Sequence, residues 1–233
     1  LFSILIFFAA LYASGQEVRT VIQTGHYSAI TAVCYSSDGR FIATGSEDKT
    51  VKLWRRTDGR EIRSYNGNSS GIRSVSINSS MSLILAVGDN GIVTIWNLNT
   101  GETLKHFKHE TDKFTCACFN PQGTKIATGS YKSFISVWDI NSGNKIIDLK
   151  ATPADHEYTR GFEYPEAGSV SWSNDGKYIV AGVADYTAII WDAVSGKEIR
   201  KFKNSGSTCT SCVCEAIITS DNKYVINTSD DSL

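Results

Sequence analysis

The chain has 233 residues, of which 41% are hydrophobic and 20% are charged, and its formal net charge at pH 7 is −1. These proportions are typical of a soluble globular protein and exclude a disordered or fibrous one. Because the net charge is close to zero, the chain has no general attraction for nucleic acid or for an anionic membrane, and we expect neither as a partner. One local basic cluster is expected to form a solvated outer face rather than a track for phosphates. It consists of Lys49, Lys52, Arg55 and Arg56.

The sequence opens with an uncharged apolar run over residues 1–13, followed by two small residues and Gln16. This pattern is typical of a signal peptide that is cleaved before Gln16, and the run is too short to span a bilayer comfortably. We therefore predict a signal peptide over residues 1–15 and an exported protein, secreted or periplasmic, with no membrane span in its mature chain. In the alternative interpretation this run ends a preceding repeat unit and the protein is cytoplasmic, because residues 14–19 copy the pattern of residues 195–200.

Four tryptophans divide the rest of the chain into copies of one unit. They are Trp54, Trp96, Trp138 and Trp191, at separations of 42, 42 and 53 residues. Each tryptophan ends a short run of β-branched and apolar residues. A period near 42 residues indicates a stacked or radial array, because one unit is too small to bury its own hydrophobic face.

Glycines repeat in the same register and mark the turns between expected strands. Fifteen residues before a tryptophan stand Gly39, Gly123 and Gly176, and five residues after one stand Gly59, Gly101, Gly143 and Gly196. Glycine supplies the positive φ that tight hairpin turns require. The segments between these turns have strand length and no convincing helical stretch interrupts them. The pattern predicts an all-β fold, a β-propeller of four-stranded antiparallel blades.

The units resemble those of the WD-repeat family, which is named for a tryptophan-aspartate pair. That pair is present twice, and the family's glycine-histidine pair once, as Trp138-Asp139, Trp191-Asp192 and Gly25-His26. The second place of the pair differs in Trp54-Arg55 and Trp96-Asn97. The resemblance covers residues 16–233.

The register divides this truncated propeller into five units and one loop insertion. The units span approximately residues 24–66, 67–108, 109–150, 166–203 and 204–233, and the insertion spans residues 150–168. We expect four complete blades, part of a fifth, and an N-terminal closing strand over residues 17–22. The family's usual number of blades is seven, so the resemblance implies that the remaining blades come from a missing C-terminal segment.

The resemblance also implies a buried hydrogen-bonded network of His, Ser or Thr, Asp and Trp in each blade. The first unit carries all four residues, as His26, Thr44, Asp48 and Trp54. The other units keep fewer members, with Val87 and Ala181 at the hydroxyl place of the second and fourth. Those that remain are Trp96, His109, Thr128, Trp138, Asp185 and Trp191.

A catalytic interpretation of the pair His26 and Asp48 exists, because such a pair can orient a general base. No suitably spaced nucleophile accompanies the pair, so we favour a structural role and expect no enzyme activity and no cofactor.

Six cysteines fall into two groups. Core packing is the expected role of Cys34, Cys116 and Cys118. The second group lies where the fourth unit passes into the fifth, as Cys209, Cys212 and Cys214. A structural zinc site needs four ligands and no fourth is evident nearby, so we expect a disulfide or simple burial there and no metal.

The insertion between the third and fourth units is the best candidate for a binding loop. It falls on the top rim of the propeller, and its candidate partner-binding residues are Tyr158, Arg160, Phe162 and Tyr164. Tyrosine and arginine are enriched at interaction hot spots, and loops on rigid scaffolds carry binding residues. In the alternative, these aromatic residues fold back as a cover for the blades.

The same rim is expected to display the residue that precedes each aspartate place of the network. These residues are Glu47, Asp89, Tyr131 and Asp230. Three acids on one rim favour a partner with basic or hydrogen-bond-donating groups, although an acidic rim also serves solubility alone.

The resemblance implies a non-enzymatic protein-protein interaction scaffold that presents its top rim to a protein or peptide partner. The alternative function is a targeting or regulatory propeller module of a larger enzyme, for example a peptidase-like one, with its catalytic domain beyond residue 233. Binding of a sugar or small ligand in the central channel is a third possibility, because propellers host many unrelated functions.

The predicted signal peptide is tested by the N-terminus of the mature protein. Mass spectrometry of the protein purified from its natural source should find Gln16, or a residue next to it, at the start of the chain. A mature chain that still carries residues 1–13 would show that this segment is no leader.

Overall fold

The computed structural model describes residues 25–109, 112–132, 134–150, 167–183, 187–203 and 213–229. Within these ranges the regular structure is entirely β-strand, and there is no helix of the length and apolarity needed to cross a membrane. The predicted signal peptide and closing strand lie outside the described residues, as do residues 151–166 of the predicted insertion.

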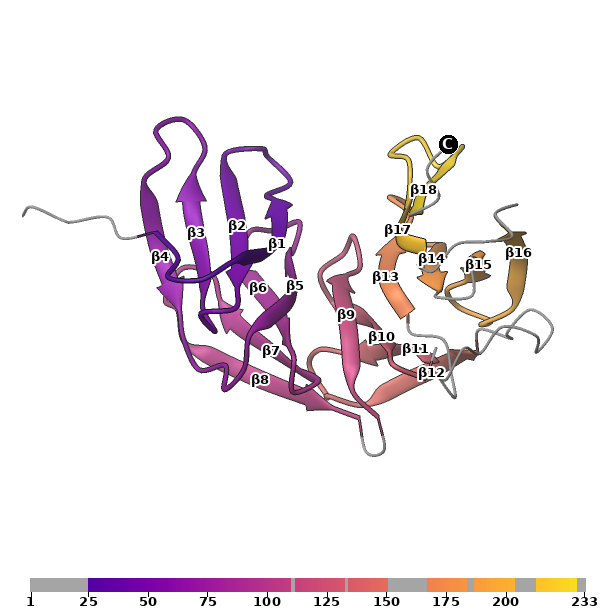
Figure 1. The fold of residues 1–233 in the computed structure, drawn as a ribbon. Helices are drawn as coiled ribbons and strands as arrows, with labels where there is room; N and C mark the ends of the chain where they lie inside the picture. The colour runs from indigo at the N-terminus through magenta and orange to yellow at the C-terminus, as the bar shows by residue number, and fades with distance from the viewer. Residues whose placement is uncertain are drawn as a thin grey trace, which may run out of the picture.

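The described strands form four antiparallel four-stranded sheets and one hairpin, each in sequence order (Figure 1). Blade 1 consists of β1 (Ile30–Tyr35), β2 (Phe41–Ser46), β3 (Val51–Arg55) and β4 (Glu61–Tyr65). Blade 2 consists of β5 (Ile72–Ile77), β6 (Leu83–Gly88), β7 (Ile92–Asn97) and β8 (Thr103–Lys108). Blade 3 consists of β9 (Phe114–Phe119), β10 (Lys125–Ser130), β11 (Phe134–Asp139) and β12 (Lys145–Lys150). Blade 4 consists of β13 (Ala167–Trp172), β14 (Tyr178–Val183), β15 (Thr187–Asp192) and β16 (Glu198–Lys203), and the hairpin of β17 (Val213–Ile218) and β18 (Val225–Ser229) follows. The predicted all-β fold of four-stranded antiparallel blades is confirmed, whereas seven blades in a complete ring stays a prediction.

The turn between the first and second strand of each unit requires a left-handed backbone. Gly39, Gly123 and Gly176 adopt φ values of 66°, 68° and 72° at this place. At the same place stand Met81 in blade 2, with φ 57°, and Asn222 in the last hairpin, with φ 59°. The repeated conformation explains why glycine recurs fifteen residues before three of the tryptophans.

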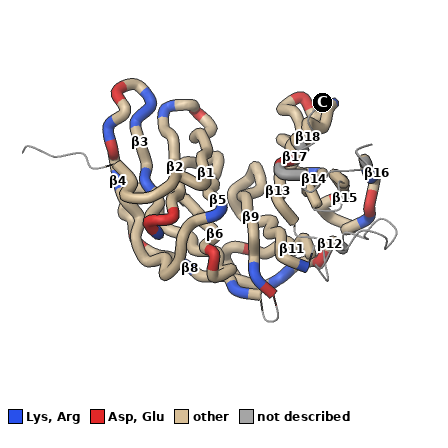
Figure 2. Tube along the Cα trace, viewed as in Figure 1, with Lys and Arg blue, Asp and Glu red and all other residues tan. Residues whose placement is uncertain are grey.

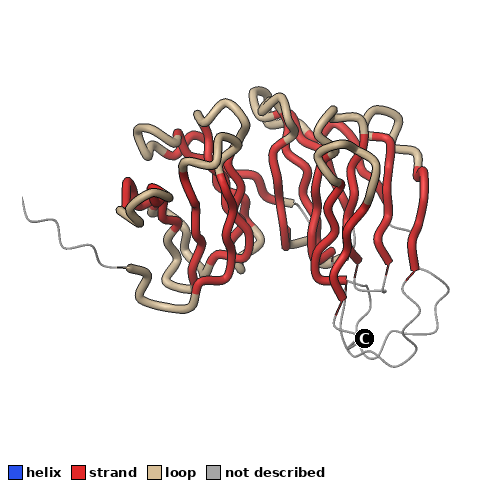
Figure 3. The backbone as a smooth tube through the Cα atoms, turned by 90° about the horizontal axis from the view of Figure 1, so that it is seen from above, coloured by secondary structure: helices blue, strands red, loops and turns tan. Residues whose placement is uncertain are grey.

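Successive blades pack face to face around a common axis (Figures 1 and 3). The first strands of neighbouring blades, β1, β5, β9, β13 and β17, lie against one another along this axis. Hydroxyl groups join them, because Thr31 Oγ1 donates to the carbonyl of Ile72 at 2.5 Å and Thr115 Oγ1 donates to that of Ala167 at 2.5 Å. Blade 1 and the β17–β18 hairpin form the two arms of an open arc in Figure 1.

Each hydrophobic cluster draws its residues from two neighbouring units. Blade 1 contributes Leu53 and Tyr65 to the first cluster, and blade 2 contributes Ile84 and Trp96. Equivalent clusters lie between blades 2 and 3, between blades 3 and 4, and between blade 4 and β17. On the face of β1 turned away from blade 2, by contrast, the side chains of Val33 and Tyr35 are 65% and 63% exposed.

The three predicted core cysteines lie in these first strands, Cys34 on β1 and Cys116 and Cys118 on β9. Burial raises the pKa of Cys34 to about 12 and also raises the pKa of Cys118. Cys116 is buried in the cluster between blades 3 and 4. The side chains of Cys209, Cys212 and Cys214 are outside the part of the chain that the structure describes.

The basic cluster on blade 1 is only partly the solvated face that its composition predicts. Lys49, Arg55 and Arg56 are exposed, but Lys52 is buried and its Nζ lies 2.8 Å from Glu61 Oε2 on β4. A buried ammonium group requires such a partner. Elsewhere in the described residues acidic and basic side chains are interspersed along the arc (Figure 2).

Tyr65 fastens blade 1 to blade 2. Its buried hydroxyl donates to the carbonyl oxygen of Leu98 at 2.6 Å, and its ring centroid lies 6.0 Å from that of Trp96. Burial raises the pKa of Tyr65 to about 12. Between blades 2 and 3 the equivalent carbonyl belongs to Ile140. Its oxygen accepts a hydrogen bond from Lys105 Nζ at 2.8 Å instead of from a tyrosine hydroxyl.

Replacing Tyr65 tests this link between blades. Tyr65→Phe should lower the free energy of unfolding by about 1 to 2 kcal/mol, because the carbonyl of Leu98 loses its donor in a buried place. The measurement is chemical denaturation, with Tyr35→Phe as the same change on an exposed ring. Equal stability of the two variants would contradict the assigned role of Tyr65.

Candidate functional site

Three of the predicted rim residues occupy the same place in three blades. Glu47, Asp89 and Tyr131 follow the second strand of blades 1, 2 and 3. Their backbone N–H groups donate to the carbonyl oxygens of Ala29 at 3.0 Å, Gly71 at 2.8 Å and Lys113 at 3.1 Å, respectively. The repeated bond ties each second strand to the segment that leads into the first strand, and so fixes the backbone of the rim.

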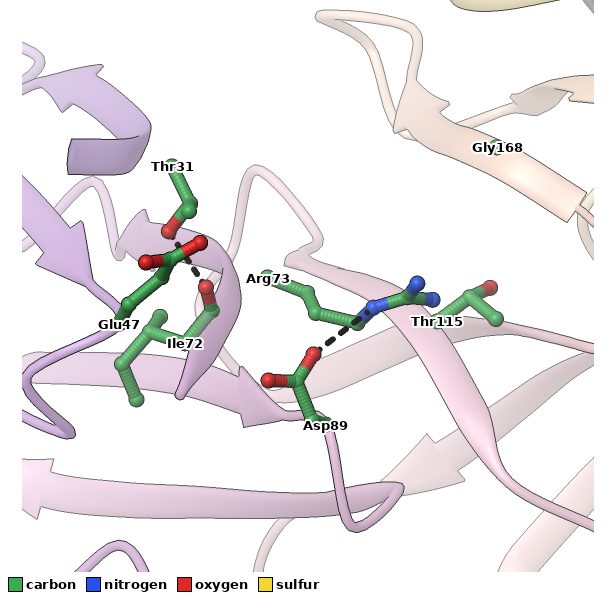
Figure 4. A pocket seen from close by; sticks show the side chains of 7 residues that line it. All are labelled: Thr31, Glu47, Ile72, Arg73, Asp89, Thr115 and Gly168. Carbon is green, nitrogen blue, oxygen red and sulfur yellow. Dashed lines mark hydrogen bonds and ion pairs between the residues drawn. The ribbon is translucent and has the colours of Figure 1, made fainter. Parts of the chain in front are cut away.

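A cavity of about 380 Å³ opens beside Glu47 and Asp89, and we call it the channel mouth (Figure 4). Its lining is Thr31, Glu47, Ile72, Arg73, Asp89, Thr115 and Gly168. Four of the lining residues hold the second place of the first strand in successive blades, namely Thr31, Arg73, Thr115 and Gly168. Because these first strands lie along the common axis, the cavity lies on the axial side of the arc, at the rim end of the sheets.

Arg73 joins the rim residues of two blades. Its Nε lies 3.0 Å from Asp89 Oδ1 (Figure 4). Its guanidinium carbon lies 5.3 Å from the centre of the Tyr131 ring. A cation over an aromatic face is attractive, so Tyr131 and Asp89 hold the same side chain from two sides. On the blade 1 side, the Glu47 carboxylate accepts a hydrogen bond from Ser28 Oγ at 3.0 Å.

Gly71 allows Glu47 and Asp89 to approach each other. A Cβ atom at this residue would lie 2.7 Å from Asp89 Oδ2 and 3.3 Å from the Cα atom of Glu47. A larger residue would therefore require the Asp89 carboxylate to move and the Glu47 backbone to shift by a few tenths of an ångström. The role of Gly71 cannot be recognised from the sequence, because this glycine does not stand at one of the repeated turn positions.

The remaining predicted rim residues are not placed by the structure. Tyr158, Arg160, Phe162, Tyr164 and Asp230 lie outside the described residues, as does Asp185 of the predicted network. Arg73 is not among the residues that the sequence pattern singles out. Its signal is the repeat register, which places it one period after Thr31 and one before Thr115.

The four network residues of blade 1 form one chain of hydrogen bonds. Trp54 Nε1 donates to Thr44 Oγ1 at 2.8 Å, His26 Nε2 lies 2.7 Å from the same oxygen, and His26 Nδ1 lies 2.8 Å from Asp48 Oδ2. The side chains of His26 and Asp48 are only 2% and 6% exposed. The pair is therefore enclosed by blade 1 rather than presented to a substrate, and it ties the loop before β1 to the β2–β3 turn.

The network changes its partners in blade 2. Trp96 pairs with Ile84 as Trp54 pairs with Ile42, so Ala86, not Val87, stands at the hydroxyl place. Without that hydroxyl, Trp96 Nε1 donates to the carbonyl of Asn66 at 3.0 Å.

Blade 3 keeps the bond between tryptophan and hydroxyl but uses its histidine differently. Trp138 Nε1 donates to Thr128 Oγ1 at 3.0 Å. His109 packs on aromatic rings, with its ring centroid 6.4 Å from that of Phe134 and 5.9 Å from that of Phe114. In blade 4, Trp191 is buried in the shared core.

The described residues offer no alternative centre for metal chemistry, since no group of three or more His, Cys, Asp or Glu side chains there could hold an ion. The channel mouth provides two carboxylates, one guanidinium and hydroxyl groups on fixed backbone, and the Tyr131 ring lies against that guanidinium. Such a set suits recognition by hydrogen bonds and charge.

Comparison with known sequences identifies the repeat. A family described as WD domain, G-beta repeat, matches residues 15–55, 59–97, 101–139 and 165–192. Protein tipD of Dictyostelium discoideum is 40% identical over 76 residues, which cover 29% of this chain and 12% of that protein. A ribosome biogenesis protein BOP1 homolog of Drosophila virilis is 37% identical over 51 residues, or 22% of this chain and 6% of that protein. The serine-threonine kinase receptor-associated protein of Gallus gallus is 41% identical over 49 residues, or 21% of this chain and 13% of that protein, so the matches span only a small part of each relative.

The blade 1 network generates a prediction for pH dependence. Burial favours the neutral form of the Asp48 carboxyl, but hydrogen bonds from Thr50, the backbone N–H of Tyr27 and His26 outweigh it and hold its pKa well below the usual range. A lowered folded-state pKa stabilises the fold above the unfolded value of about 4, and this contribution is lost as the pH falls below it. Asp48→Asn should therefore unfold more easily at pH 7 and lose less stability between pH 5 and pH 3 than the natural protein.

Thermal unfolding at several pH values measures this effect. Glu102→Gln, which removes one negative charge at an exposed turn, is the control and should keep the natural pH profile. An Asp48→Asn profile parallel to the natural one would show that Asp48 does not supply the acid-sensitive stability.

Proposed function

The chain belongs to the WD40 repeat family, and from this premise we propose that it is a non-enzymatic interaction scaffold whose channel mouth and rim bind a protein or peptide partner. The observation that carries the proposal is that Glu47 of blade 1, Arg73 and Asp89 of blade 2 and Thr115 of blade 3 line one cavity, while Tyr131 of blade 3 lies against Arg73. Rigid blades hold these side chains, while the residues at their place vary from blade to blade. Binding sites on repeat scaffolds have this character.

The types of residue at the mouth support protein recognition. Tyrosine and arginine are the residues that most often dominate the energy of protein interfaces, because they combine a large contact area with directed polar groups. Here the Arg73 guanidinium lies 5.3 Å from the centre of the Tyr131 ring and also forms a 3.0 Å ion pair with Asp89. These contacts already hold the two side chains in position. A partner would therefore pay little conformational entropy to order them.

The charge of the mouth favours a partner with basic or hydrogen-bond-donating groups. Asp89 forms an ion pair with Arg73, and the Glu47 carboxylate accepts a hydrogen bond from the hydroxyl of Ser28. A carboxylate has about four acceptor positions, so Glu47 can accept further donors from a partner. The cavity of about 380 Å³ has room for a side chain of that partner.

The names of two relatives agree with a role in assembly. The protein of Gallus gallus is named for its association with a serine-threonine kinase receptor, and the protein of Drosophila virilis is named for ribosome biogenesis. We take from them the class of function alone, because their matched segments are short. The partner of this chain is proposed here only by its chemistry.

Capture experiments test the proposed surface. The immobilised protein should retain a partner from an extract of its own cells, and the double variant Glu47→Gln, Asp89→Asn should weaken retention about tenfold or more, because charged hydrogen bonds at a partner's basic group are lost. Tyr131→Ala should weaken it as well. The melting temperature should stay unchanged, since these side chains lie on the rim.

Tyr224→Ala is the matched control, because this tyrosine is 66% exposed on the β17–β18 hairpin, away from the mouth. It should capture as much partner as the natural protein. Unchanged capture by the rim variants would refute the assignment of the surface.

A further inference from the structure

A second groove lies between blades 1 and 2 at the end of the sheets opposite the rim. Its volume is about 350 Å³, and its lining is Arg40, Phe41, Leu53, Ile62, Arg63, Met81, Leu98 and Asn99. These residues belong to the β1–β2, β3–β4, β5–β6 and β7–β8 turns or lie beside them. In an antiparallel sheet these turns stand at the end away from the β2–β3 and β6–β7 turns, which carry the channel mouth.

The floor and walls of this groove are apolar. Leu53 and Leu98 belong to the core shared by blades 1 and 2, and Phe41 and Met81 pack against that core. Ile62 on β4 is 38% exposed at the edge. The shared core thus reaches the surface here as an apolar recess.

Met81 contributes its side chain to one wall of the groove although its backbone adopts a left-handed conformation that favours glycine. It adopts φ 57° at the turn place where Gly39, Gly123 and Gly176 stand in the other blades. Glycine would relieve this conformation, so Met81 carries a local backbone strain, as Asn222 does at the same place in the last hairpin. Methionine is also the apolar side chain that adapts most readily to different ligands.

Two arginines of blade 1, Arg40 and Arg63, line the recess. The Arg63 guanidinium donates to the carbonyl of Thr100 at 2.9 Å, and the Arg40 side chain, 73% exposed, bonds Asp38 and lies over the Phe41 ring. Arg55 ends β3, and Arg56 and Arg60 follow in the adjoining β3–β4 turn. Among the described residues only Arg40 and Arg55 of these five have a carboxylate partner, Asp38 and Asp58. The groove therefore carries an excess of positive charge.

The equivalent place between blades 2 and 3 is built differently. Lys105 replaces Arg63, and its Nζ donates to the carbonyl oxygens of Ile140 and Asn141 at 2.8 Å and 2.7 Å. Gly123 replaces Met81. The combination of an apolar wall and arginines thus belongs to the first pair of blades. The equivalent place between blades 2 and 3 serves as a control for experiments on the groove.

We propose that this groove is a second docking site, which binds a partner segment with an apolar side chain flanked by acidic residues. The apolar side chain enters the recess over Leu53 and Leu98, and the acidic groups pair with Arg40 and Arg63. The charge of this groove is opposite to that of the channel mouth. The scaffold accordingly holds two partners at once, a basic one at the rim and an acidic one at the opposite end.

Selection from a random peptide library displayed on phage tests this proposal with the full chain. The enriched peptides should combine Leu, Ile, Phe or Met with neighbouring Asp or Glu. Fluorescence anisotropy with a labelled enriched peptide should show at least tenfold weaker binding to Ile62→Glu and to Arg63→Glu, and weaker binding at higher salt. Arg40→Glu should also weaken binding. Because the Arg40 side chain is exposed, this change leaves the packing of the core unaltered.

The matched variants in the next blade are Leu104→Glu and Lys105→Glu, which should bind the peptide within twofold of the natural protein. Glu47→Gln should bind it equally well, so failure at the rim and failure at the groove are distinguishable. Each variant's melting temperature is measured alongside. Absence of enriched peptides that combine apolar with acidic residues, or equal losses in the matched variants, would overturn the proposal.

Discussion

The fold depends on one constraint: no blade has a hydrophobic core of its own. Each sheet buries one face against the next, and every cluster between the described blades takes its residues from two neighbours. Burial of Trp96 or Trp191 removes about 150 to 250 Å² from water, which far exceeds the contribution of any single hydrogen bond in the blade network. This difference explains why blade 2 tolerates the loss of the hydroxyl at Ala86, where Trp96 finds the carbonyl of Asn66 instead.

The same constraint makes the channel mouth possible. Because neighbouring blades are locked together, equivalent residues of different blades meet at fixed distances around one axis. The second place of the first strand carries a hydroxyl in blades 1 and 3, a guanidinium in blade 2 and a glycine in blade 4. Variation at repeated positions therefore changes the chemistry of the mouth without altering the scaffold. The groove at the opposite end follows the same rule, since Arg63 and Met81 have Lys105 and Gly123 as their counterparts.

The sequence predicts this architecture well because its signals are periodic. Tryptophan spacing and turn glycines predict the sheets, and the rim positions Glu47, Asp89 and Tyr131 follow from the same register. Details of side-chain environment are less accessible, because a shift of one residue turns a strand residue to the other face. Val87 instead of Ala86 is an error of this kind. The ammonium group of Lys52 can be buried because Glu61 lies beside it on the next strand. Arg73 becomes part of the candidate site because Tyr131 of another blade contacts it. Neither contact can be recognised from a local sequence pattern.

The central claim is that three blades act together as one binding surface at the channel mouth. Hydrogen-deuterium exchange of the protein with and without its captured partner tests this most directly. The claim predicts that binding increases protection in the segments around Glu47, Arg73, Asp89 and Tyr131 together, because one ligand contacts all three blades. Increased protection confined to a single blade, or absent from all of these segments, would contradict it.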